Sequence, residues 1–185
     1  MKRGIFGGTF DPTHLSHVLA CHYVLETSDI NIIYVVPCLK HPFGKTVTAF
    51  EHRLEMCRLA MQRLEPDVQV LDIEGKRGGV SYTIDTVHEL RECFPDDELL
   101  LIIGSDLLKE MHDWKNFDEI IHIAPLYIIP RLMDESRPEL TNPEKFFLPD
   151  ISSTMVRKKL HNKESIEQYL PQSVIKYIHQ HNLYP

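Results

Sequence analysis

Short apolar runs alternate with amphipathic stretches along most of the chain. Five of these runs have the length and the β-branched or aliphatic composition of strands, and they cover residues 3–6, 31–36, 68–73, 99–103 and 126–129. Two of them, 31–36 and 99–103, are almost uniformly apolar, as expected of strands that are covered on both faces. Strands that alternate with helical patterns predict βαβ units, and hence a Rossmann-like α/β fold with a doubly wound parallel sheet of about five strands.

Helical spacing of apolar residues fills most of the segments between these runs. The helices are predicted to cover, or to begin at, residues 14–25, 48–51, 81–93 and 116–119. In the first of them, Leu15, Val18, Cys21 and Leu25 are predicted to share the buried face. The second and the fourth begin with the spacing of a capping box, in which side chains satisfy the free amides of the first turn.

The pattern changes after the fifth run. Residues 131–145 are charged, contain two prolines and lack apolar periodicity, so a surface loop is predicted there. Ser152 or Ser153 can cap a helix over residues 154–160, and residues 171–181 are predicted to form the last helix. The chain contains no internal repeat and no long linker. It is therefore predicted to be a single domain whose C-terminal part, from about residue 150, is helical.

The composition limits what the chain is expected to bind. A net charge of −7 argues against a nucleic-acid partner, since a phosphate backbone requires a basic face. No apolar run approaches the roughly 18 residues of a membrane span, and no signal peptide is expected. The four cysteines are far apart and form no CxxC pair, so they predict free thiols and a cytoplasmic location. The oligomeric state is left open, and a homo-oligomer is compatible with the sequence.

The loop after the first predicted strand concentrates residues that can bind phosphate. In open α/β sheets, ligands bind beyond the carboxyl ends of the strands, and residues 7–17 at such an end read GGTFDPTHLSH. Gly7 and Gly8 let the backbone approach a ligand closely, and amides at a helix start favour phosphate oxygens. His14 and His17 are about one turn apart on one helix face, where each can donate a ring N–H to phosphate.

The same features have simpler explanations when they are taken singly. Paired glycines after a strand are common in turns, and two histidines at this spacing can be a metal pair or unrelated surface residues. No HExxH motif or third spaced ligand accompanies His14 and His17, as a catalytic zinc site would require. The combination of strand, glycines and paired histidines is more specific than its parts, and it favours a phosphate site.

Four motifs occur along the chain: GGTFDPTHLSH at 7–17, SYTIDT at 81–86, GSD at 104–106 followed by Trp114, and ISSTMVR at 151–157. They resemble GGxFDPxHxGH, SYTxDT, GxD…W and ISSTxxR, the signatures of the nicotinate mononucleotide adenylyltransferases within the HxGH nucleotidyltransferase superfamily. In this order they cover nearly the whole chain. Two departures stand out. Ser16 replaces the glycine of HxGH and brings a side chain to a place where the triphosphate would pack closely, and residues 131–133 read RLM rather than a glycine-containing turn.

The resemblance implies transfer of the adenylyl group of ATP to nicotinate mononucleotide, which gives deamido-NAD and pyrophosphate in NAD biosynthesis. The nucleophile would be the phosphate of the mononucleotide, which is already anionic near neutral pH, so no general base is required. Catalysis would depend on positioning and on stabilising charge in the transition state. Mg²⁺ would be the cofactor, held mainly by phosphate oxygens and water rather than by protein ligands.

The resemblance also implies three groups of site residues. His14, His17 and Arg157 are expected to be catalytic. The residues expected to bind ATP are Gly7, Gly8, Thr9, Phe10, His14, His17, Gly104, Asp106, Ser152, Ser153, Thr154 and Arg157. Those expected to bind the mononucleotide are Lys45, Tyr82, Thr83, Trp114 and Arg131.

Some of these residues have a structural alternative that stays open. Lys45 and Arg131 could be solvated in their loops, as lysines and arginines mostly are. Asp106 could cap the turn that follows it, and Trp114 could be an ordinary core aromatic.

Of all the functional features, the substrate that accepts the adenylyl group is the one that the sequence determines least. Main-chain amides around Tyr82 and Thr83 are expected to bind the nicotinate carboxylate, with no arginine or lysine nearby in sequence. Nicotinamide mononucleotide and phosphopantetheine remain alternative acceptors, although the phosphopantetheine enzymes lack SYTxDT. Outside adenylyl transfer, the alternatives are a non-catalytic dinucleotide-binding module and a metal-dependent hydrolase built on His14 and His17.

Overall fold

The computed structural model of the chain describes residues 1–42, 44, 46–130 and 148–185. Five strands form one parallel sheet in the order β3-β2-β1-β4-β5. They are β1 (Lys2–Gly8), β2 (Ile32–Pro37), β3 (Val68–Val70), β4 (Glu98–Gly104) and β5 (Leu126–Ile129). The predicted Rossmann-like, doubly wound sheet is confirmed. The strand order reverses between β1 and β4, which is the place where ligands bind in sheets of this kind.

Two strand boundaries differ from the prediction. β1 continues through Gly7 and Gly8, which pair with the last two residues of β2, so the glycines end the strand rather than follow it. β3 ends at Val70, because the chain turns there into a short helix that begins at Ile73.

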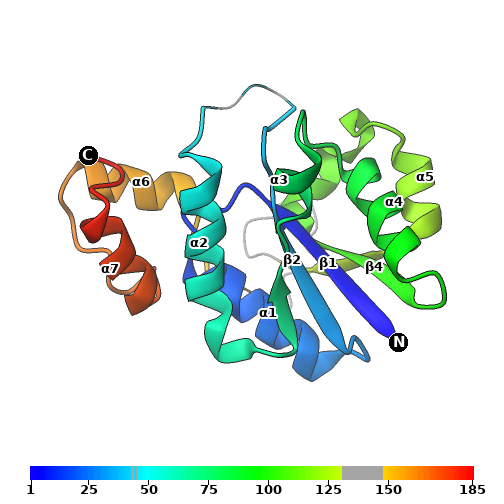
Figure 1. The fold of residues 1–185 in the computed structure, drawn as a ribbon. Coiled ribbons are helices and arrows are strands. Elements are labelled where there is room, and N and C mark those ends of the chain that lie inside the picture. Colours follow the sequence, from blue (N-terminus) through cyan, green and yellow to red (C-terminus); the bar gives the residue numbers. More distant parts are fainter. Residues whose placement is uncertain (43, 45, 131–147) are drawn as a thin grey trace.

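Helices connect the strands and cover both faces of the sheet (Figure 1). They are α1 (Leu15–Thr27), α2 (Phe50–Met61), α3 (Ile73–Arg77), α4 (Thr83–Cys93), α5 (Phe117–Ile123), α6 (Ser153–His161) and α7 (Gln172–Gln180). Short 3₁₀ turns cover Gln62–Leu64, Ser105–Lys109 and Met111–Asp113. The helices expected at 14–25, 81–93, 154–160 and 171–181 are therefore found close to their predicted bounds.

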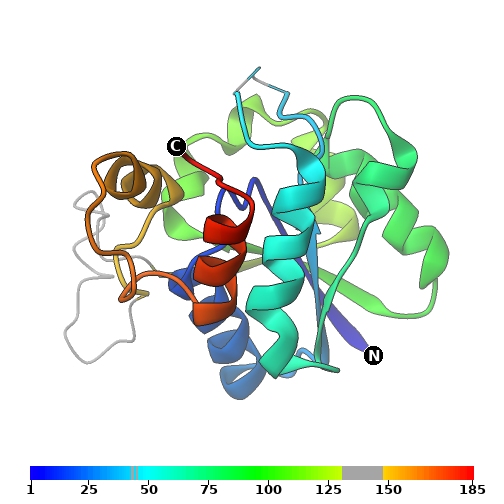
Figure 2. The same cartoon turned by 60° about the vertical axis from the view of Figure 1, so that its left-hand side comes forward.

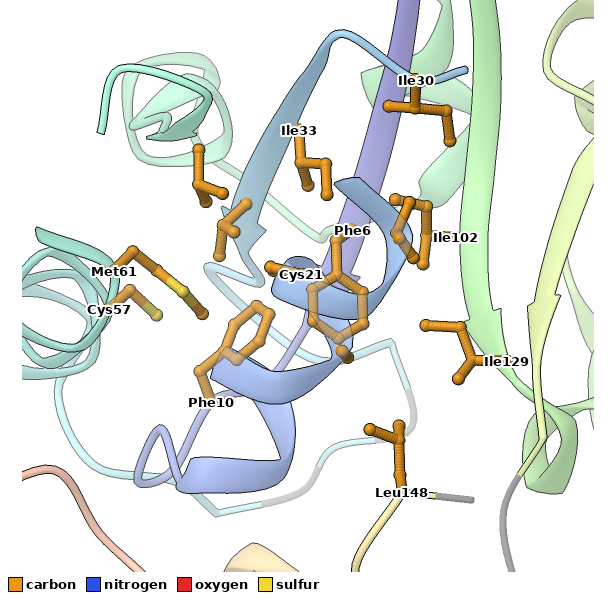
Figure 3. Packing of buried hydrophobic residues seen from close by; sticks show 14 residues of the cluster. Phe6, Phe10, Cys21, Ile30, Ile33, Cys57, Met61, Ile102, Ile129 and Leu148 are labelled. Carbon is orange, nitrogen blue, oxygen red and sulfur yellow. The ribbon is translucent and has the colours of Figure 1, made fainter. Parts of the chain in front are cut away.

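Neighbouring residues of the central strands point to opposite faces, and each face has its own core. Phe6, Ile33 and Ile102 pack with side chains of α1 and α2 (Figure 3). Ile5 and Leu101 point the other way and pack with side chains of α4 and α5. Two covered faces explain why the central runs of the sequence are apolar at nearly every position.

The buried face of α1 differs from the predicted one. The residues that this helix buries most completely are Ser16, Ala20, Cys21 and Val24. Only Cys21 belongs to the predicted set. Leu15 packs against the C-terminal helices, and Val18 contacts both those helices and the core beside the sheet, because α1 lies between the two and has two contact faces.

Both predicted capping boxes are wrong as helix caps. α2 begins after Ala49 with no side-chain cap. Ahead of α5, Asn116 has left-handed backbone angles, with φ of 55°, and its side chain accepts no backbone N–H of this helix, but donates from Nδ2 to Glu119 Oε2 at 3.0 Å. The cap predicted for α6 is confirmed, because Ser152 Oγ accepts from the backbone N of Met155 at 3.2 Å.

A third layer lies outside α2, formed by α6 and α7 (Figures 1 and 2). Met56 and Ala60 of α2 pack there with Val156 of α6 and with Val174 and Ile178 of α7. This packing brings the N-terminus of α6 beside the loop that follows β1.

The predicted surface loop at 131–145 lies outside the described residues. In the part of the chain that is described, no helix has the length and apolar character needed to cross a bilayer.

Candidate active site

A cleft of about 430 Å³ opens beyond the carboxyl ends of β1, β2 and β4. It lies at the reversal of strand order, as expected for this architecture. Ten residues predicted to bind substrate line it: Gly7, Gly8, Thr9, Phe10, His17, Tyr82, Thr83, Gly104, Asp106 and Trp114. The structure thus gathers segments that are far apart in the sequence around one opening.

The absence of a side chain has a different structural consequence at each of the two glycines that end β1. A Cβ atom at Gly7 would meet no protein atom within 4 Å, so a side chain there would extend into the cleft and occupy room for a ligand. A Cβ at Gly8 would come to 3.0 Å from the ring of Phe10. Gly7 therefore allows close approach of substrate, whereas Gly8 allows Phe10 to pack.

Phe10 is a buried residue of the loop after β1 and packs against His17. Its φ of 51° is left-handed, which folds the ring back under the loop, and the side chain is 2% exposed. The ring packs edge-on against Phe6 and His17, with centroids 5.6 and 4.9 Å away. Phe10 lines the cleft, its ring helps to orient His17, and its contact with ATP stays a prediction.

His14 and His17 form a rigid pair at the start of α1. The backbone N of His14 donates to Nδ1 of His17 at 3.1 Å, and the rings stack with centroids 3.6 Å apart. Because Nδ1 of His17 accepts this bond, its neutral ring carries the proton on Nε2. His17 lines the cleft, whereas His14 is 2% exposed and lies behind it. The pair can therefore present an N–H donor to an anion from a fixed position.

Ser16, the departure from HxGH, points away from the cleft. Its side chain is fully buried, and Oγ donates to the backbone oxygen of Pro149 at 2.5 Å. The hydroxyl thus joins α1 to the segment that leads into α6. Ser16 is therefore not among the residues that line the cleft.

The start of α6 docks on the loop after β1. Arg157 Nη1 donates to the backbone oxygen of Asp11 at 2.6 Å, and Nη2 donates to Thr154 Oγ1 at 3.2 Å. Ser153 Oγ donates to the backbone oxygen of Pro12 at 3.0 Å. The second predicted signature therefore contacts the first. Its residues do not line the cleft, however, but lie across the loop from it.

The pyridine side of the predicted site is formed by Tyr82, Thr83 and Trp114. Thr83 is the first residue of α4, where backbone N–H groups have no acceptor within the helix. Trp114 lines the cleft and also packs against the core beneath α4 and α5, so it is a core aromatic, and its contact with a pyridine ring stays a prediction. Asp106 lies inside its 3₁₀ turn, which has Gly104 at the cap position, so it is not the N-cap.

Lys115 is a cleft residue that the sequence interpretation missed. Its ammonium group lies 4.5 Å from the ring centre of Tyr82 and 3.6 Å from Asp85 Oδ1. The interpretation that no arginine or lysine is nearby in sequence was wrong. The signal was available, because Lys115 directly follows Trp114.

Arg53 is a second residue that was missed, and it is 1% exposed. Its guanidinium donates to four backbone oxygens: Thr48 at 2.8 Å, Thr9 at 2.8 Å, Cys38 at 2.6 Å and Leu39 at 3.1 Å. It therefore ties together the loops that follow β1 and β2 and the segment ahead of α2. Nothing in the sequence distinguishes it from a surface arginine on a helix.

The SYTIDT motif also has a structural role. Ser81 Oγ accepts from the backbone N of Leu39 at 2.9 Å and of Lys40 at 3.1 Å. Glu74, which is buried, accepts from Leu39 N at 3.0 Å and from Thr86 Oγ1 at 3.0 Å. The loop after β2 is thereby held against the start of α4.

Two predicted substrate contacts, Lys45 and Arg131, lie outside the described residues. The four cysteines are free thiols. Burial raises the pKa of Cys57 to about 12, which makes it a poor nucleophile. Within the described ranges, no three His, Cys, Asp or Glu side chains are grouped so that they could hold a metal ion.

The chain is similar in sequence to a known protein family. The family model described as Cytidylyltransferase-like matches residues 5–159. A protein of Flavobacterium psychrophilum named "Probable nicotinate-nucleotide adenylyltransferase" is 34% identical over 192 residues, which cover 100% of this chain and 99% of that protein. A protein of the same name from Oceanobacillus iheyensis is 35% identical, with 98% and 95% covered.

A similar solved structure is that of Plasmodium falciparum nicotinic acid mononucleotide adenylyltransferase complexed with NaAD. It matches with a TM-score of 0.85 at 26% identity and covers 99% of this chain and 97% of that chain.

Proposed function

The chain belongs to the Cytidylyltransferase-like family and, within it, to the nicotinate-nucleotide adenylyltransferases, and on that premise we propose that its cleft joins ATP to nicotinate mononucleotide. A phosphate oxygen of the mononucleotide attacks the α-phosphorus of ATP, and the bond from that phosphorus to the bridging oxygen of pyrophosphate breaks. The products are deamido-NAD and pyrophosphate. The observation that carries the proposal is that His17, stacked on His14, lines the cleft together with Gly7, while Arg157 contacts Asp11 of the same loop after β1.

The phosphates of ATP would lie along this loop. His17 would donate from Nε2 to an oxygen of the α- or β-phosphate, where negative charge increases in the transition state. Arg157 would bind the departing pyrophosphate, aided by the amides at the start of α6. Ser152, Ser153 and Thr154 belong to that start, and Gly7 leaves room for the reacting phosphorus. The attacking phosphate is already an anion, so no residue has to remove a proton.

ATP would enter as its complex with a divalent metal ion, which we propose to be Mg²⁺. The groups placed to face the phosphates are ring N–H, guanidinium and amide donors, and these bind anions rather than cations. The ion would therefore take its ligands mainly from phosphate oxygens and water, as Mg²⁺ commonly does. It would neutralise part of the charge on the triphosphate.

The pyridine mononucleotide would occupy the other end of the cleft. Tyr82 and Trp114 offer flat faces for the ring, and the first N–H groups of α4 suit the nicotinate carboxylate. Lys115 adds a cation at this end. For Lys45 and Arg131, contact with the mononucleotide phosphate is proposed from the sequence resemblance.

We also propose a cytoplasmic location, because all four cysteines are free, as thiols remain in a reducing compartment.

Pyrophosphate release tests the reaction class. The protein is supplied with ATP, Mg²⁺ and, in separate reactions, nicotinate mononucleotide, nicotinamide mononucleotide or phosphopantetheine. We expect the fastest release with nicotinate mononucleotide, with deamido-NAD as the second product. Binding of the dinucleotide without any release of pyrophosphate would instead support the non-catalytic alternative.

A further inference from the structure

The loop between β1 and α1 contains a buried carboxylate that the reaction itself does not use. Asp11 is 2% exposed and lies between the start of α2 and the start of α6. Its Oδ2 accepts from the backbone N of Thr48 at 3.3 Å, a long hydrogen bond. A buried carboxylate needs stronger partners than this one.

The strongest donor to Asp11 comes from the far end of the sequence. The hydroxyl of Tyr184 donates to Asp11 Oδ1 at 2.7 Å, across 173 positions of sequence. Burial, and after it the hydrogen bond to Asp11, raises the pKa of Tyr184 well above its ordinary value. The hydroxyl therefore stays protonated and remains a donor throughout the neutral range.

The same aspartate adjoins the predicted pyrophosphate ligand. Arg157 Nη1 donates to the backbone oxygen of Asp11 at 2.6 Å but lies 3.9 Å from its carboxylate oxygen Oδ2. Arg157 is thus anchored through a neutral carbonyl, while the nearby carboxylate is held by Tyr184. The ion pair between Arg157 and the Asp11 carboxylate is long, at 3.9 Å, so the carboxylate does not occupy the guanidinium N–H groups that a phosphate could bind.

We propose that Tyr184 is a positioning residue for adenylyl transfer: by holding the Asp11 carboxylate it prevents that carboxylate from capturing Arg157. This inference rests on the proposed function, in which Arg157 binds the pyrophosphate portion of ATP. Without the hydroxyl, Asp11 Oδ1 would lose its donor in a place that is closed to water. Asp11 would then turn to the cation beside it, and Arg157 would be drawn away from the phosphates.

The test is Tyr184→Phe, which removes the hydroxyl and keeps the ring. Steady-state kinetics should show kcat/KM for ATP lowered about tenfold, as expected when a hydrogen bond to a buried charged group is lost, while KM for nicotinate mononucleotide is unchanged. In an Arg157→Ala background the same substitution should have almost no further effect, because the two residues act as one unit.

Tyr177→Phe is the matched control. Its hydroxyl bonds to His52 Nδ1 at 2.9 Å in the same C-terminal layer, and among the described residues it forms no hydrogen bond with the loop after β1. This variant should keep normal kcat/KM for both substrates. Tyr184→Phe could instead lower kcat/KM equally in the wild-type and Arg157→Ala backgrounds, or lower it for both substrates. Either result would mean that the tyrosine only stabilises the fold. Unchanged kinetics would also overturn the proposal.

A second variant covers the case in which Tyr184→Phe does not fold. The double variant Tyr184→Phe/Asp11→Asn leaves no buried carboxylate without a donor, and it is compared with Asp11→Asn alone. Equal kcat/KM for ATP in the two would support the proposal, since Tyr184 would have no charge left to restrain. A lower value in the double variant would contradict it.

If the wild-type protein released no pyrophosphate with any acceptor, the proposed function would be wrong, but the role of Tyr184 in holding Arg157 could still be tested. Calorimetric titration of wild type and Tyr184→Phe with ATP would then decide the role of Tyr184. About tenfold weaker binding by the variant would support that role, and equal binding would overturn it.

Discussion

At the residue scale, the proposed phosphate donors have directions that contacts within the protein already fix. The ring of His17 is held on one side by the backbone N of His14 and on another by the edge of Phe10. Arg157 is held by Asp11 and Thr154. Donors that are fixed in this way need not reorganise as charge moves onto the leaving pyrophosphate, which is how such groups lower a barrier.

His17→Ala should lower kcat about 10²-fold or more, because one transition-state donor is lost. Circular dichroism and thermal unfolding should show that the variant is folded. His22→Ala, on the exposed side of the same helix, is the control and should keep normal turnover. A folded His17→Ala protein with near-normal kcat would remove His17 from the mechanism.

Lys115 should contribute to acceptor choice, because its ammonium lies beside Tyr82 at the pyridine end of the cleft. Lys115→Met should reduce the preference for the acid over the amide mononucleotide about threefold to tenfold, as expected for one partly exposed charge. The measurement is kcat/KM for each acceptor, with Lys176→Met on α7 as the surface control. An equal fall in kcat/KM for both acceptors would show that Lys115 does not recognise the nicotinate carboxylate.

At the element scale, the cleft depends on loops that have almost no regular structure of their own. The loops after β1 and β2 are held by Arg53, and the second of them also by Glu74 and Ser81. Sequence patterns predicted the strands and most helices well, because burial on two faces leaves a clear apolar signal. Helix starts were predicted less well. Thr48, for example, uses its backbone to bind Asp11 and Arg53 rather than its side chain to cap α2.

Arg53→Met should destabilise the protein strongly, because four part-buried carbonyl oxygens would lose the donor that the buried guanidinium supplies. We expect the free energy of unfolding to fall by about 3 kcal/mol or more, since each unsatisfied buried group costs roughly 1–3 kcal/mol. Urea denaturation monitored by fluorescence measures this change.

Arg58→Met is the control on the same helix. Arg58 is half exposed, and its ion pair with Glu55 has a distance of 3.6 Å. Its loss should therefore change stability by less than about 1 kcal/mol. Equal effects of the two substitutions would show that the contacts of Arg53 do not hold the loops together.

At the scale of the whole molecule, function depends on contacts between the two ends of the chain. The third layer, formed by α6 and α7 outside α2, brings Arg157 and Tyr184 to the loop after β1 (Figure 2). The resemblance to the adenylyltransferase signatures implied that the first and last motifs act together. It could not predict Tyr184 or Arg53, because neither belongs to a local pattern and their partners are set by tertiary packing.

Competition between the two mononucleotides tests adenylyl transfer to nicotinate mononucleotide most directly. The protein is incubated with ATP, Mg²⁺ and equal concentrations of nicotinate mononucleotide and nicotinamide mononucleotide, and the consumption of each is followed by chromatography. We predict that pyrophosphate and deamido-NAD form and that the acid is consumed with at least about tenfold higher kcat/KM, a difference of about 1.36 kcal/mol in barrier. Equal consumption, or faster loss of the amide, would contradict the nicotinate assignment, and no consumption of either would contradict adenylyl transfer itself.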